Sequence, residues 1–533
     1  MKKRIISLIT VLCITVCGIG ARLITITTDT KYASTQNSLR VRNLGERRGF
    51  IYDRNMRPLA NTSERTLACM IPCVQSYKLL CKLRGEAFAD STVGKGYFTT
   101  IELKANEDLP HNKIYKTFKV YERYCDNTAL HILGYTDIDG EGVCGIEKFY
   151  NNELKKYGGE LSIAYNADAT ERMITDITTE VRNNNYFEKT GIVLTLDKDI
   201  QIIAENALKN GNITKGAAIV LEAESCAILA CASTPVYDRN NISEYLSSPD
   251  SPFINRALTA FPVGSVFKCV TSAAAIENNI PLIDYTCTGS IEKSGNIFNC
   301  NKNDGHGRLN FYNALAHSCN PYFIELSTKT GGERLLKTAK ALGFGKSVDL
   351  GNGFMSDEGN LPDIKELNSD AALGNFGFGQ GSLTATPLQI AACFAVFANG
   401  GIYNTPYLYK GVTDKSGAFT PEIKINSRKA LKDTTCKVIS DALYKVTESG
   451  TGKAAKSIFF DACTKTATAQ SGQYDENGNE IKYCWFAGYF PYDNPRYVIC
   501  ILKENGSSGG TDGAPVFKEI SENIYFYEKY GNQ

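Results

Sequence analysis

Residues 262–278 read Pro262-Val-Gly-Ser-Val-Phe-Lys-Cys-Val-Thr-Ser-Ala-Ala-Ala-Ile-Glu-Asn278, which predicts a turn followed by a buried helix. Gly264 suits the turn, and almost every residue after Ser265 is apolar or small. In a helix from Ser265 to Asn278, the Ser265 hydroxyl and the Lys268 amine lie on the same face. Because burial near a second cation lowers the pKa of a lysine, Lys268 can take the proton of a nucleophilic Ser265. The helix N-terminus adds partial positive charge where an oxyanion forms.

A serine three residues before a lysine is not specific by itself. Ser290-Ile-Glu-Lys293 repeats the pattern but runs into the turn signal Ser294-Gly-Asn296, so we expect no helix there. Taken alone, Ser265 is more simply interpreted as a cap of a core helix, with Lys268 extending toward solvent. The prediction of a nucleophile therefore needs further partners elsewhere in the chain.

Two later segments supply such partners. Ser318-Cys319-Asn320 lies at a turn before a helix expected over 321–329. Lys465-Thr-Ala-Thr-Ala-Gln470 precedes a strand expected over 483–490, with which it can pair. A second Lys-Thr segment, Lys329-Thr-Gly331, lies at the end of the helix expected over 321–329, where Gly331 fits a C-cap. That copy is too close to Asn320 to form the opposite wall of a cleft. We therefore assign Lys465, and not Lys329, as the lysine that faces Ser265 from the other wall.

The composition is that of an ordinary globular protein of several domains. The chain has 533 residues, of which 43% are hydrophobic and 22% charged, which excludes a disordered or polytopic membrane protein. A net charge of +1 indicates no nucleic-acid partner. With only four His, the chain is not expected to be a multi-His metal enzyme, and the sequence predicts neither a metal nor a cofactor.

The N-terminus predicts a membrane anchor over residues 1–27. Lys2, Lys3 and Arg4 precede a charge-free run from Ile5 to Ala21, which spans about 26 Å as a helix and can cross a bilayer. The positive flank belongs on the cytoplasmic side, so we expect the rest of the chain outside the membrane. A cleavable signal peptide is the alternative, although Arg22 follows at once and no Ala-x-Ala site stands out.

The rest of the chain divides near residue 190. Residues 28–190 mix short strand-like and helix-like pieces, whereas residues 191–533 are richer in apolar runs. In the second part we expect a strand over 191–197, a helix over 200–208, a hairpin over 216–231, and strands over 483–490 and 497–502.

The 18 Cys are too few for a disulfide scaffold yet many for an exported protein. Cys69, Cys73 and Cys81 have a loose metal-like spacing without a nearby His, so we interpret them as free thiols that pack as small apolar residues. Cys287 and Cys300 bracket a stretch rich in Gly, Ser and Asn and are the best disulfide candidates, with free thiols as the equal alternative.

The motifs Ser265-Val-Phe-Lys268, Ser318-Cys-Asn320 and Lys465-Thr-Ala467, in this order, resemble the motif set of the penicillin-recognising acyl-serine enzymes. Nearly the whole chain resembles a class B penicillin-binding protein, a monofunctional peptidoglycan D,D-transpeptidase. The further segments that carry this resemblance are 47–55, 59–60, 131–134, 142–147, 194–197, Gln201, 230–238, 255–257, 379–381 and 386–389. The last segment also predicts a capping box, with Thr386 as N-cap and Gln389 three residues later.

The resemblance implies an α+β fold in which an antiparallel sheet covered by helices packs with an all-helical lobe that forms the other side of the cleft. We therefore expect an anchor over 1–27, an elongated α+β pedestal, dimerisation-like, over 28–190, and a transpeptidase domain over 191–533. It also implies a single-pass protein of the bacterial cell membrane with most of the chain outside. Because about 160 residues leave no room for a glycosyltransferase module, it implies a glycan-polymerising partner of the SEDS family.

The resemblance also implies the chemistry. Ser265 attacks the penultimate D-Ala carbonyl of a stem peptide and releases the terminal D-Ala, while Lys268 takes the Ser265 proton. Ser318 passes a proton to the leaving amine, and Asn320 positions the donor peptide and Lys268. A neighbouring stem-peptide amine then captures the acyl-enzyme, whereas β-lactams imitate D-Ala-D-Ala and remain as a stable ester. No cofactor is implied.

The same resemblance assigns substrate binding to the Lys465 segment. Lys465 and Thr466 bind the terminal carboxylate, and the backbone amides of Ser265 and Thr468 form the oxyanion hole. Ala467 stands where the family usually has Gly; by strand alternation its Cβ shares the Lys465 face and crowds the cleft, whereas Thr466 turns away. Two alternatives stay open: a D,D-carboxypeptidase that uses water, and a catalytically impaired cell-wall scaffold marked by Ala467.

Overall fold

The computed structural model describes residues 2–28, 39–109, 111–168, 170–174, 179–423, 425–474 and 478–531. They form two compact units. Unit 1 comprises Met1–Arg48, Asn61–Arg123 and Gly158–Glu188, and unit 2 comprises Gly49–Ala60, Tyr124–Tyr157 and Lys189–Gln533. The last change of unit lies beside the boundary expected near residue 190, but two segments of the expected 28–190 module belong to unit 2.

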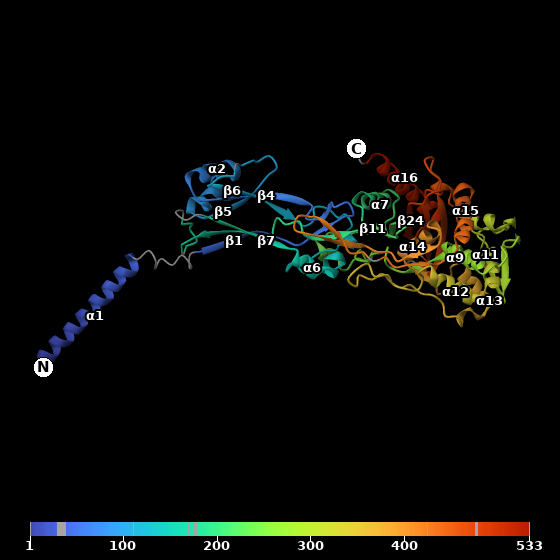
Figure 1. Cartoon of the computed structure of the whole chain (residues 1–533), viewed down its shortest axis with the longest axis horizontal. Helices are drawn as coiled ribbons and strands as arrows, with labels where there is room; N and C mark the ends of the chain where they lie inside the picture. Colours follow the sequence, from blue (N-terminus) through green and yellow to red (C-terminus); the bar gives the residue numbers. More distant parts are fainter. Residues whose placement is uncertain are drawn as a thin grey trace. The chain divides into compact units, whose positions relative to one another are not determined.

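The first helix, α1 (Lys2–Thr28), contains an apolar stretch from Lys2 to Thr25 with a mean hydropathy of 2.1 and no buried residues (Figure 1). In the described part of the chain, it is the only helix long and apolar enough to cross a membrane. The Thr10 and Thr15 hydroxyls donate to carbonyls one turn earlier, so these polar groups are satisfied without water. A signal sequence has the same length and composition.

Unit 1 is built on two three-stranded antiparallel sheets. One has the order β1 (Leu39–Arg47), β7 (Gly159–Asn166), β8 (Glu180–Asn184), and the other the order β5 (Thr99–Leu103), β4 (Ser63–Met70), β6 (Tyr115–Glu122). The helices α2 (Val74–Arg84) and α3 (Glu86–Ser91) pack on the second sheet through Leu80 and Ala89. This mixture of short elements agrees with the sequence-based expectation.

The cysteines are free thiols in both units. The disulfide prediction for Cys287 and Cys300 is therefore wrong, and the free-thiol alternative is confirmed. Cys300 Sγ lies instead 3.3 Å from His306 Nδ1 and 3.9 Å from Cys319 Sγ. The interpretation of Cys69, Cys73 and Cys81 as free thiols is also confirmed. Cys73 has a local role, because its sulfur accepts the Ser76 N–H at the start of α2.

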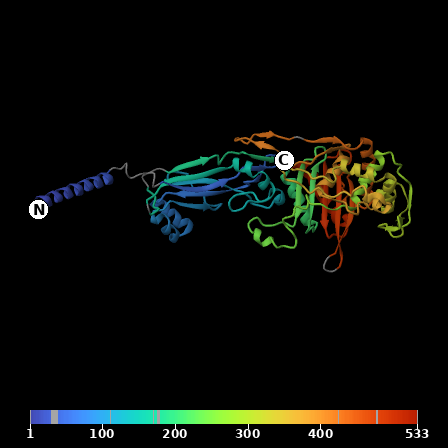
Figure 2. The same ribbon diagram turned by 90° about the horizontal axis from the view of Figure 1, so that it is seen from below.

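The central sheet of unit 2 has the order β11 (Ile228–Thr234), β10 (Gly216–Glu222), β24 (Tyr497–Glu504), β23 (Glu480–Phe490), β22 (Cys463–Tyr474), and every neighbouring pair is antiparallel. The predicted hairpin and C-terminal strands are confirmed. Figure 2 shows the red and orange strands β22, β23 and β24 running side by side. Strand β22 pairs with β23 from Cys463 opposite Tyr489 to Gln470 opposite Lys482, as predicted, and forms one edge of the sheet.

Helices cover both faces of this sheet because its strands are apolar on both faces. On β24, Ile499 and Ile501 pack with α7 (Lys198–Asn210) and α16 (Ala514–Tyr530). The intervening Cys500 belongs to the opposite core, with α9 (Lys268–Glu277) and α14 (Pro387–Ala398). This follows from the alternation of side chains along a strand. The antiparallel sheet covered by helices is the predicted fold.

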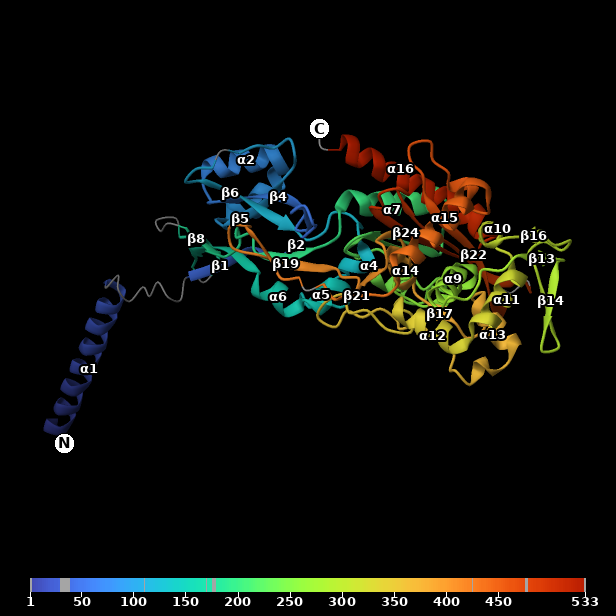
Figure 3. The same ribbon diagram turned by 45° about the vertical axis from the view of Figure 1, so that its right-hand side comes forward.

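Further helices pack beside α9 and form the expected lobe (Figure 3). They are α10 (Phe311–Ala316), α11 (Asn320–Thr330), α12 (Gly332–Ala341), α13 (Asp370–Gly377) and α15 (Asp433–Ser449). Gly331 ends α11 by donating its N–H to Ser327 O, as predicted. The predicted capping box of Thr386 and Gln389 begins α14.

Two-stranded ribbons border the lobe. They are β12 (Phe261–Pro262) with β17 (Thr384–Ala385), β13 (Tyr285–Cys287) with β16 (Gly307–Leu309), and β14 (Ser290–Lys293) with β15 (Asn296–Asn299). The second Ser-x-x-Lys copy is therefore a strand, and it lacks the helix that would align its Ser and Lys, as predicted.

A second five-stranded sheet of unit 2 has the order β20 (Phe419–Pro421), β19 (Tyr409–Thr413), β9 (Gly191–Leu194), β2 (Phe50–Tyr52), β3 (Pro58–Ala60). Strand β2 runs parallel to β9. The remaining elements of this unit are short: β18 (Ile402–Asn404) with β21 (Ser427–Lys429), and the helices α4 (Leu130–Leu133), α5 (Gly145–Phe149), α6 (Asn151–Lys156) and α8 (Ile242–Tyr245).

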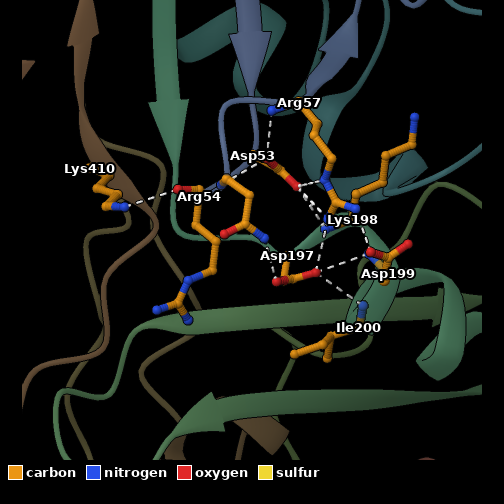
Figure 4. A network of polar contacts seen from close by, with 9 residues as sticks. Asp53, Arg54, Arg57, Asp197, Lys198, Asp199, Ile200 and Lys410 are labelled. Atoms are coloured by element: carbon orange, nitrogen blue, oxygen red, sulfur yellow. Dashed lines mark hydrogen bonds and ion pairs between the residues drawn. The ribbon is translucent and has the colours of Figure 1, made fainter. Parts of the chain in front are cut away.

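A buried carboxylate joins the early segment Gly49–Ala60 to the start of α7 (Figure 4). Asp53 is 0% exposed and accepts the N–H groups of Asn55, Arg57 and Lys198. The Arg57 guanidinium bonds to Asp53 at 2.8 Å and forms ion pairs with Asp197 and Asp199. Residues 49–55 of the 47–55 motif therefore belong to unit 2, whereas Arg47 and Arg48 belong to unit 1, the unit of the module in which the sequence placed the motif.

The motifs at 131–134 and 142–147 also lie in unit 2. Two glycines allow the backbones of the two motifs to contact each other. Gly134 has φ +77°, and a Cβ there would lie 2.0 Å from Cys144 O. Gly145 has φ +58°, and its Cβ would lie 2.5 Å from Ile132 O. Each glycine thus permits a backbone approach that a side chain would block.

Asp53→Ala should destabilise unit 2 by about 2–4 kcal/mol, because it leaves three backbone N–H groups without their acceptor and removes one of the three carboxylates that Arg57 contacts. The measurement is the urea midpoint followed by the fluorescence of Trp485, the single tryptophan, which is fully buried in β23. The exposed Asp139→Ala is the matched control and should change stability by less than about 0.5 kcal/mol. Equal losses of stability in the two variants contradict the assignment of Asp53 as a buried acceptor that stabilises unit 2.

Candidate active site

The turn before α9 carries Ser265. Residues Gly264–Phe267 form a 3₁₀ turn, and the α-helix proper begins at Lys268, whereas the sequence predicts one continuous helix. Side chains three residues apart eclipse in a 3₁₀ turn, so Ser265 and Lys268 lie on one side of it. Ser265 itself is half-buried.

Two close backbone contacts hold this turn. Gly264 has φ +68°, and its N–H donates to Gly379 O at 2.7 Å. A Cβ on Gly379 would lie 1.9 Å from Gly264 O, which explains why glycine is needed in the 379–381 motif. From the sheet, Trp485 Nε1 donates to Pro262 O at 2.8 Å.

Lys268 is fully buried and makes its hydrogen bonds with the Ser318 turn. Its Nζ donates to Ser318 O at 2.7 Å, to Ser318 Oγ at 3.1 Å and to Asn320 Oδ1 at 2.7 Å. Within the described residues, Ser265 Oγ makes no side-chain hydrogen bond. The structure therefore joins Lys268, Ser318 and Asn320 directly and places Ser265 beside them on the preceding turn.

Lys465 reaches the same serine from the edge strand β22. It is also fully buried, and its Nζ donates to Ser318 Oγ at 3.0 Å and to Thr466 O at 2.7 Å. Two ammonium groups from opposite walls thus meet at one hydroxyl. Ser318 has φ +54°, a left-handed conformation that is uncommon outside glycine, and this conformation marks the turn as a constrained one.

Burial lowers the pKa values of both lysines. Burial lowers the pKa of Lys268 well below its ordinary value, and the Lys465 charge lowers it further, in the direction that the sequence predicts. Burial lowers the pKa of Lys465 to about 8. Lys268 therefore loses its proton more readily than an ordinary lysine, as a base requires, whereas at pH 7 Lys465 keeps most of its charge.

Alternation along β22 separates two sets of side chains, as predicted. Ala467 and Ala469 share the Lys465 face, and their Cβ atoms lie against the nucleophile turn, 3.3 and 3.1 Å from a Cβ built on Gly264. Ala467 is only 3% exposed, so its methyl packs mainly on that turn. Thr466 lies on the other face of the strand, and its Oγ1 lies 2.7 Å from Thr451 Oγ1. Both threonines line the cavity, so the expectation that Thr466 turns away from the cleft is wrong.

A cavity of about 500 Å³ lies between these walls. It is lined by Ser265, Ser318, Asn320, Thr466, Ala467 and Thr468 and by residues that the sequence motifs do not include, namely Asn301, Thr451, Lys453, Ala454 and 508–511. The clearest sequence signal for the missed wall is Gly509-Gly510 just after the last strand. A Cβ on Gly509 would lie 2.1 Å from Trp485 O, so glycine is required where this loop crosses the sheet edge.

A family model described as "Penicillin binding protein transpeptidase domain" matches residues 216–522, which include every predicted site residue. The chain belongs to this family. Among curated relatives of this penicillin-binding family, it is 30% identical to "Stage V sporulation protein D" of Bacillus subtilis over 73% of this chain. It covers 61% of that protein's length. It is also 28% identical to "Peptidoglycan D,D-transpeptidase MrdA" of Haemophilus influenzae, over 78% of this chain and 70% of that protein.

Solved structures share the fold of this chain. The "D,D-Transpeptidase Domain of Peptidoglycan Glycosyltransferase" from Eggerthella lenta superposes with a TM-score of 0.65 at 23% identity, over 91% of this chain and 99% of that one. Penicillin binding protein 3 from Mycobacterium tuberculosis, complexed with ampicillin, superposes with a TM-score of 0.66 at 22% identity, over 92% and 97%. The predicted fold class is confirmed.

Gly379→Ala should destabilise the protein at least twice as much as Gly295→Ala. Both substitutions place Ala at a positive φ, +92° and +75°, which costs about 1–2 kcal/mol. Only Gly379→Ala also drives a methyl into the Gly264 carbonyl, since nothing lies within 4 Å of a Cβ at Gly295. Thermal unfolding followed by Trp485 fluorescence measures both losses, and equal losses argue against a special role for the Gly264–Gly379 contact.

Proposed function

We propose that this chain is a peptidoglycan D,D-transpeptidase that crosslinks stem peptides through an acyl-enzyme on Ser265. The observation that carries the proposal is the meeting of two buried lysines at Ser318 Oγ beside the Ser265 turn. A structural pair of lysines gains nothing from this arrangement, because their charges repel. An acyl-transfer site uses it, because one lysine serves as base and the other binds an anion.

Acylation follows from these positions. The terminal carboxylate of a D-Ala-D-Ala donor binds Thr466, which lines the cavity, and Lys465, whose Nζ contacts the cavity-lining Ser318 Oγ. Ser265 Oγ attacks the penultimate D-Ala carbonyl as its proton passes to neutral Lys268. The backbone N–H groups of Ser265 and Thr468 stabilise the oxyanion. When the tetrahedral intermediate collapses, Ser318 passes its proton to the nitrogen of the leaving D-Ala and takes back the proton that Lys268 holds.

The second half-reaction transfers the acyl group. The amine of a neighbouring stem peptide gives its proton through Ser318 to Lys268 and attacks the ester carbonyl. Lys268 then gives a proton to Ser265 Oγ as the ester bond breaks. Asn320 holds Lys268 through its Oδ1 and orients the donor amide through its Nδ2 group. Water in place of the amine makes the chain a carboxypeptidase, and loss of acylation leaves a scaffold. The packing of Ala467 on the Gly264 turn favours an open, working cleft over the scaffold.

The same proposal covers the ligands and the setting. β-Lactams acylate Ser265 because their ring and carboxylate imitate the D-Ala-D-Ala end. Residues 1–27 anchor the chain in the bacterial cell membrane with the positive flank of α1 inside and residues 28–533 outside. Residues 28–190 form the pedestal, apart from the segments that join residues 191–533 in the transpeptidase unit. A SEDS-family glycosyltransferase supplies the glycan strands.

Incubation of the full chain with a fluorescent penicillin should give one covalent adduct, located on Ser265 by mass spectrometry. Ser265→Ala should abolish the adduct, because it removes the hydroxyl that the proposal makes the nucleophile. Ser290→Ala, in the other Ser-x-x-Lys copy, is the matched control and should leave labelling unchanged. A folded wild-type chain that neither labels nor releases D-Ala from a D-Ala-D-Ala donor supports the scaffold. Donor turnover to water without crosslinks supports the carboxypeptidase.

Acylation by a penicillin should slow above pH 8. As pH rises through the Lys465 pKa of about 8, Lys465 loses the charge that binds the ligand carboxylate, so the rate approaches a tenfold fall per pH unit. Lys465→Arg keeps the charge and should move this limb to higher pH. A β-lactam whose carboxylate is esterified should lack the limb. An identical limb with both probes contradicts the assignment of Lys465 as carboxylate binder.

A further inference from the structure

Three cysteines and one histidine gather beside the Ser318-Cys319-Asn320 turn. The sulfurs of Cys287, Cys300 and Cys319 and a ring nitrogen of His306 all lie within 4.8 Å of one another. Within the described ranges, this is the one group of metal-ligating side chains so close together. The three cysteines are 0–5% exposed, and His306 is half-buried. The sequence alone predicts no metal there, because the four donors lie on separate elements without a paired spacing.

The backbone brings the four donors together from different elements. Cys287 ends β13, Cys300 follows β15, His306 precedes β16, and Cys319 precedes α11 (Figure 3). The loop between Cys300 and His306 folds back onto the end of β13, because a glycine allows contact there. Gly305 has φ +73°, and a Cβ at this position would lie 2.2 Å from Cys287 O.

The donor separations fit a tetrahedral site. With Zn–S near 2.3 Å and Zn–N near 2.0 Å, two sulfurs lie about 3.8 Å apart and a sulfur and a nitrogen about 3.5 Å apart. The corresponding distances are 3.9 Å between the sulfurs of Cys300 and Cys319, and 3.3 Å between Cys300 Sγ and His306 Nδ1. A disulfide between Cys300 and Cys319 requires sulfurs at about 2.05 Å and leaves Cys287 and His306 without a purpose.

We propose that Cys287, Cys300, His306 and Cys319 bind one Zn²⁺ as a closed structural site. Three thiolates and an imidazole form a donor set that selects zinc, and four protein ligands leave no open position for catalysis at the metal. The net charge of minus one on such a centre also suits its place beside two buried lysines, Lys268 and Lys465.

Neighbouring side chains hold the histidine and the loop as outer partners of a metal commonly do. The ring of His317 stacks on His306, with centroids 5.5 Å apart. Asn301 Nδ2 donates to His317 O at 3.1 Å, and Asn301 itself lines the active-site cavity. Asn320 Nδ2 donates to Asn299 O, next to Cys300, at 3.2 Å.

The metal acts as a positioning element for the catalytic turn. Cys319 lies between Ser318, which carries the shared hydroxyl, and Asn320, which holds Lys268. Ser318 has φ +54°, a conformation that needs support from its surroundings. A bond from Cys319 Sγ to zinc ties this turn to β13 and to the loop after β15, which fixes one wall of the cavity.

The first test is the metal content of the full chain, purified in detergent without chelators. We expect about one zinc per chain. Cys287→Ala and His306→Ala should retain about a tenth of it or less, whereas His306→Cys, which keeps four ligands, should retain it. Cys393→Ala is the matched control, because Cys393 is equally buried but lies outside the cluster.

Co²⁺ exchanged into the wild-type chain gives a second, spectroscopic readout that needs no variant to fold. Thiolate charge-transfer absorption and the intense visible bands of tetrahedral cobalt support the site. The proposal is overturned if the chain holds no zinc and takes none up from a Zn²⁺ buffer, if the cobalt spectrum is octahedral, if a disulfide between Cys300 and Cys319 is found, or if Cys393→Ala loses zinc as fully as Cys287→Ala does.

The positioning role rests on the proposed function and has its own test. Removing zinc from the wild-type chain with a chelator should slow labelling of Ser265 by fluorescent penicillin about 10- to 100-fold, and adding Zn²⁺ should restore it. Ser265→Ala should bind zinc normally. Unchanged labelling after complete zinc removal overturns the positioning role, whereas a zinc-loaded chain that never labels counts against the proposed function and leaves the metal site standing.

Discussion

The meeting of two buried lysine side chains at one hydroxyl places the strictest demand on this fold. Removing a lysine from water is costly unless acceptors replace the lost hydration, and two lysines side by side raise the cost. The acceptors are Ser318 O and Asn320 Oδ1 for Lys268, and Thr466 O for Lys465. The edge strand and the turn before α11 must therefore stand at a fixed separation, and the nucleophile turn lies between them.

The Ser318-Cys319-Asn320 turn meets that demand through several independent supports. Its backbone takes a left-handed conformation at Ser318, and its side chains bond across the cavity to Lys268 and Lys465. Behind it, Cys319 lies among three other metal-ligating side chains. A turn held on both sides keeps the shared hydroxyl in place without substrate, which is what preorganised catalysis requires.

Local patterns in the sequence predicted much of this arrangement. The Ser-x-x-Lys pair, the C-cap at Gly331 and the capping box at Thr386 and Gln389 depend on neighbours in the chain, so their spacing was sufficient. The free state of Cys287 and Cys300 was left undecided, because it depends on Cys319 and His306, which approach only through tertiary folding. The predicted domain ranges were wrong for the same reason. Segment Gly49–Ala60 joins unit 2 through parallel pairing of β2 with β9, and no local sequence pattern indicates this pairing.

The sequence by itself determined the turn that carries Ser265, the lysine of the edge strand and the apolar strands of the central sheet, because side-chain spacing along a helix or strand sets which residues share a face. Only the tertiary structure decided that Lys465 reaches Ser318 Oγ, that Gly379 lies against Gly264, and that three cysteines and a histidine converge. These contacts join residues far apart in the chain, and their geometry depends on how closely whole elements pack, which no short stretch of sequence encodes.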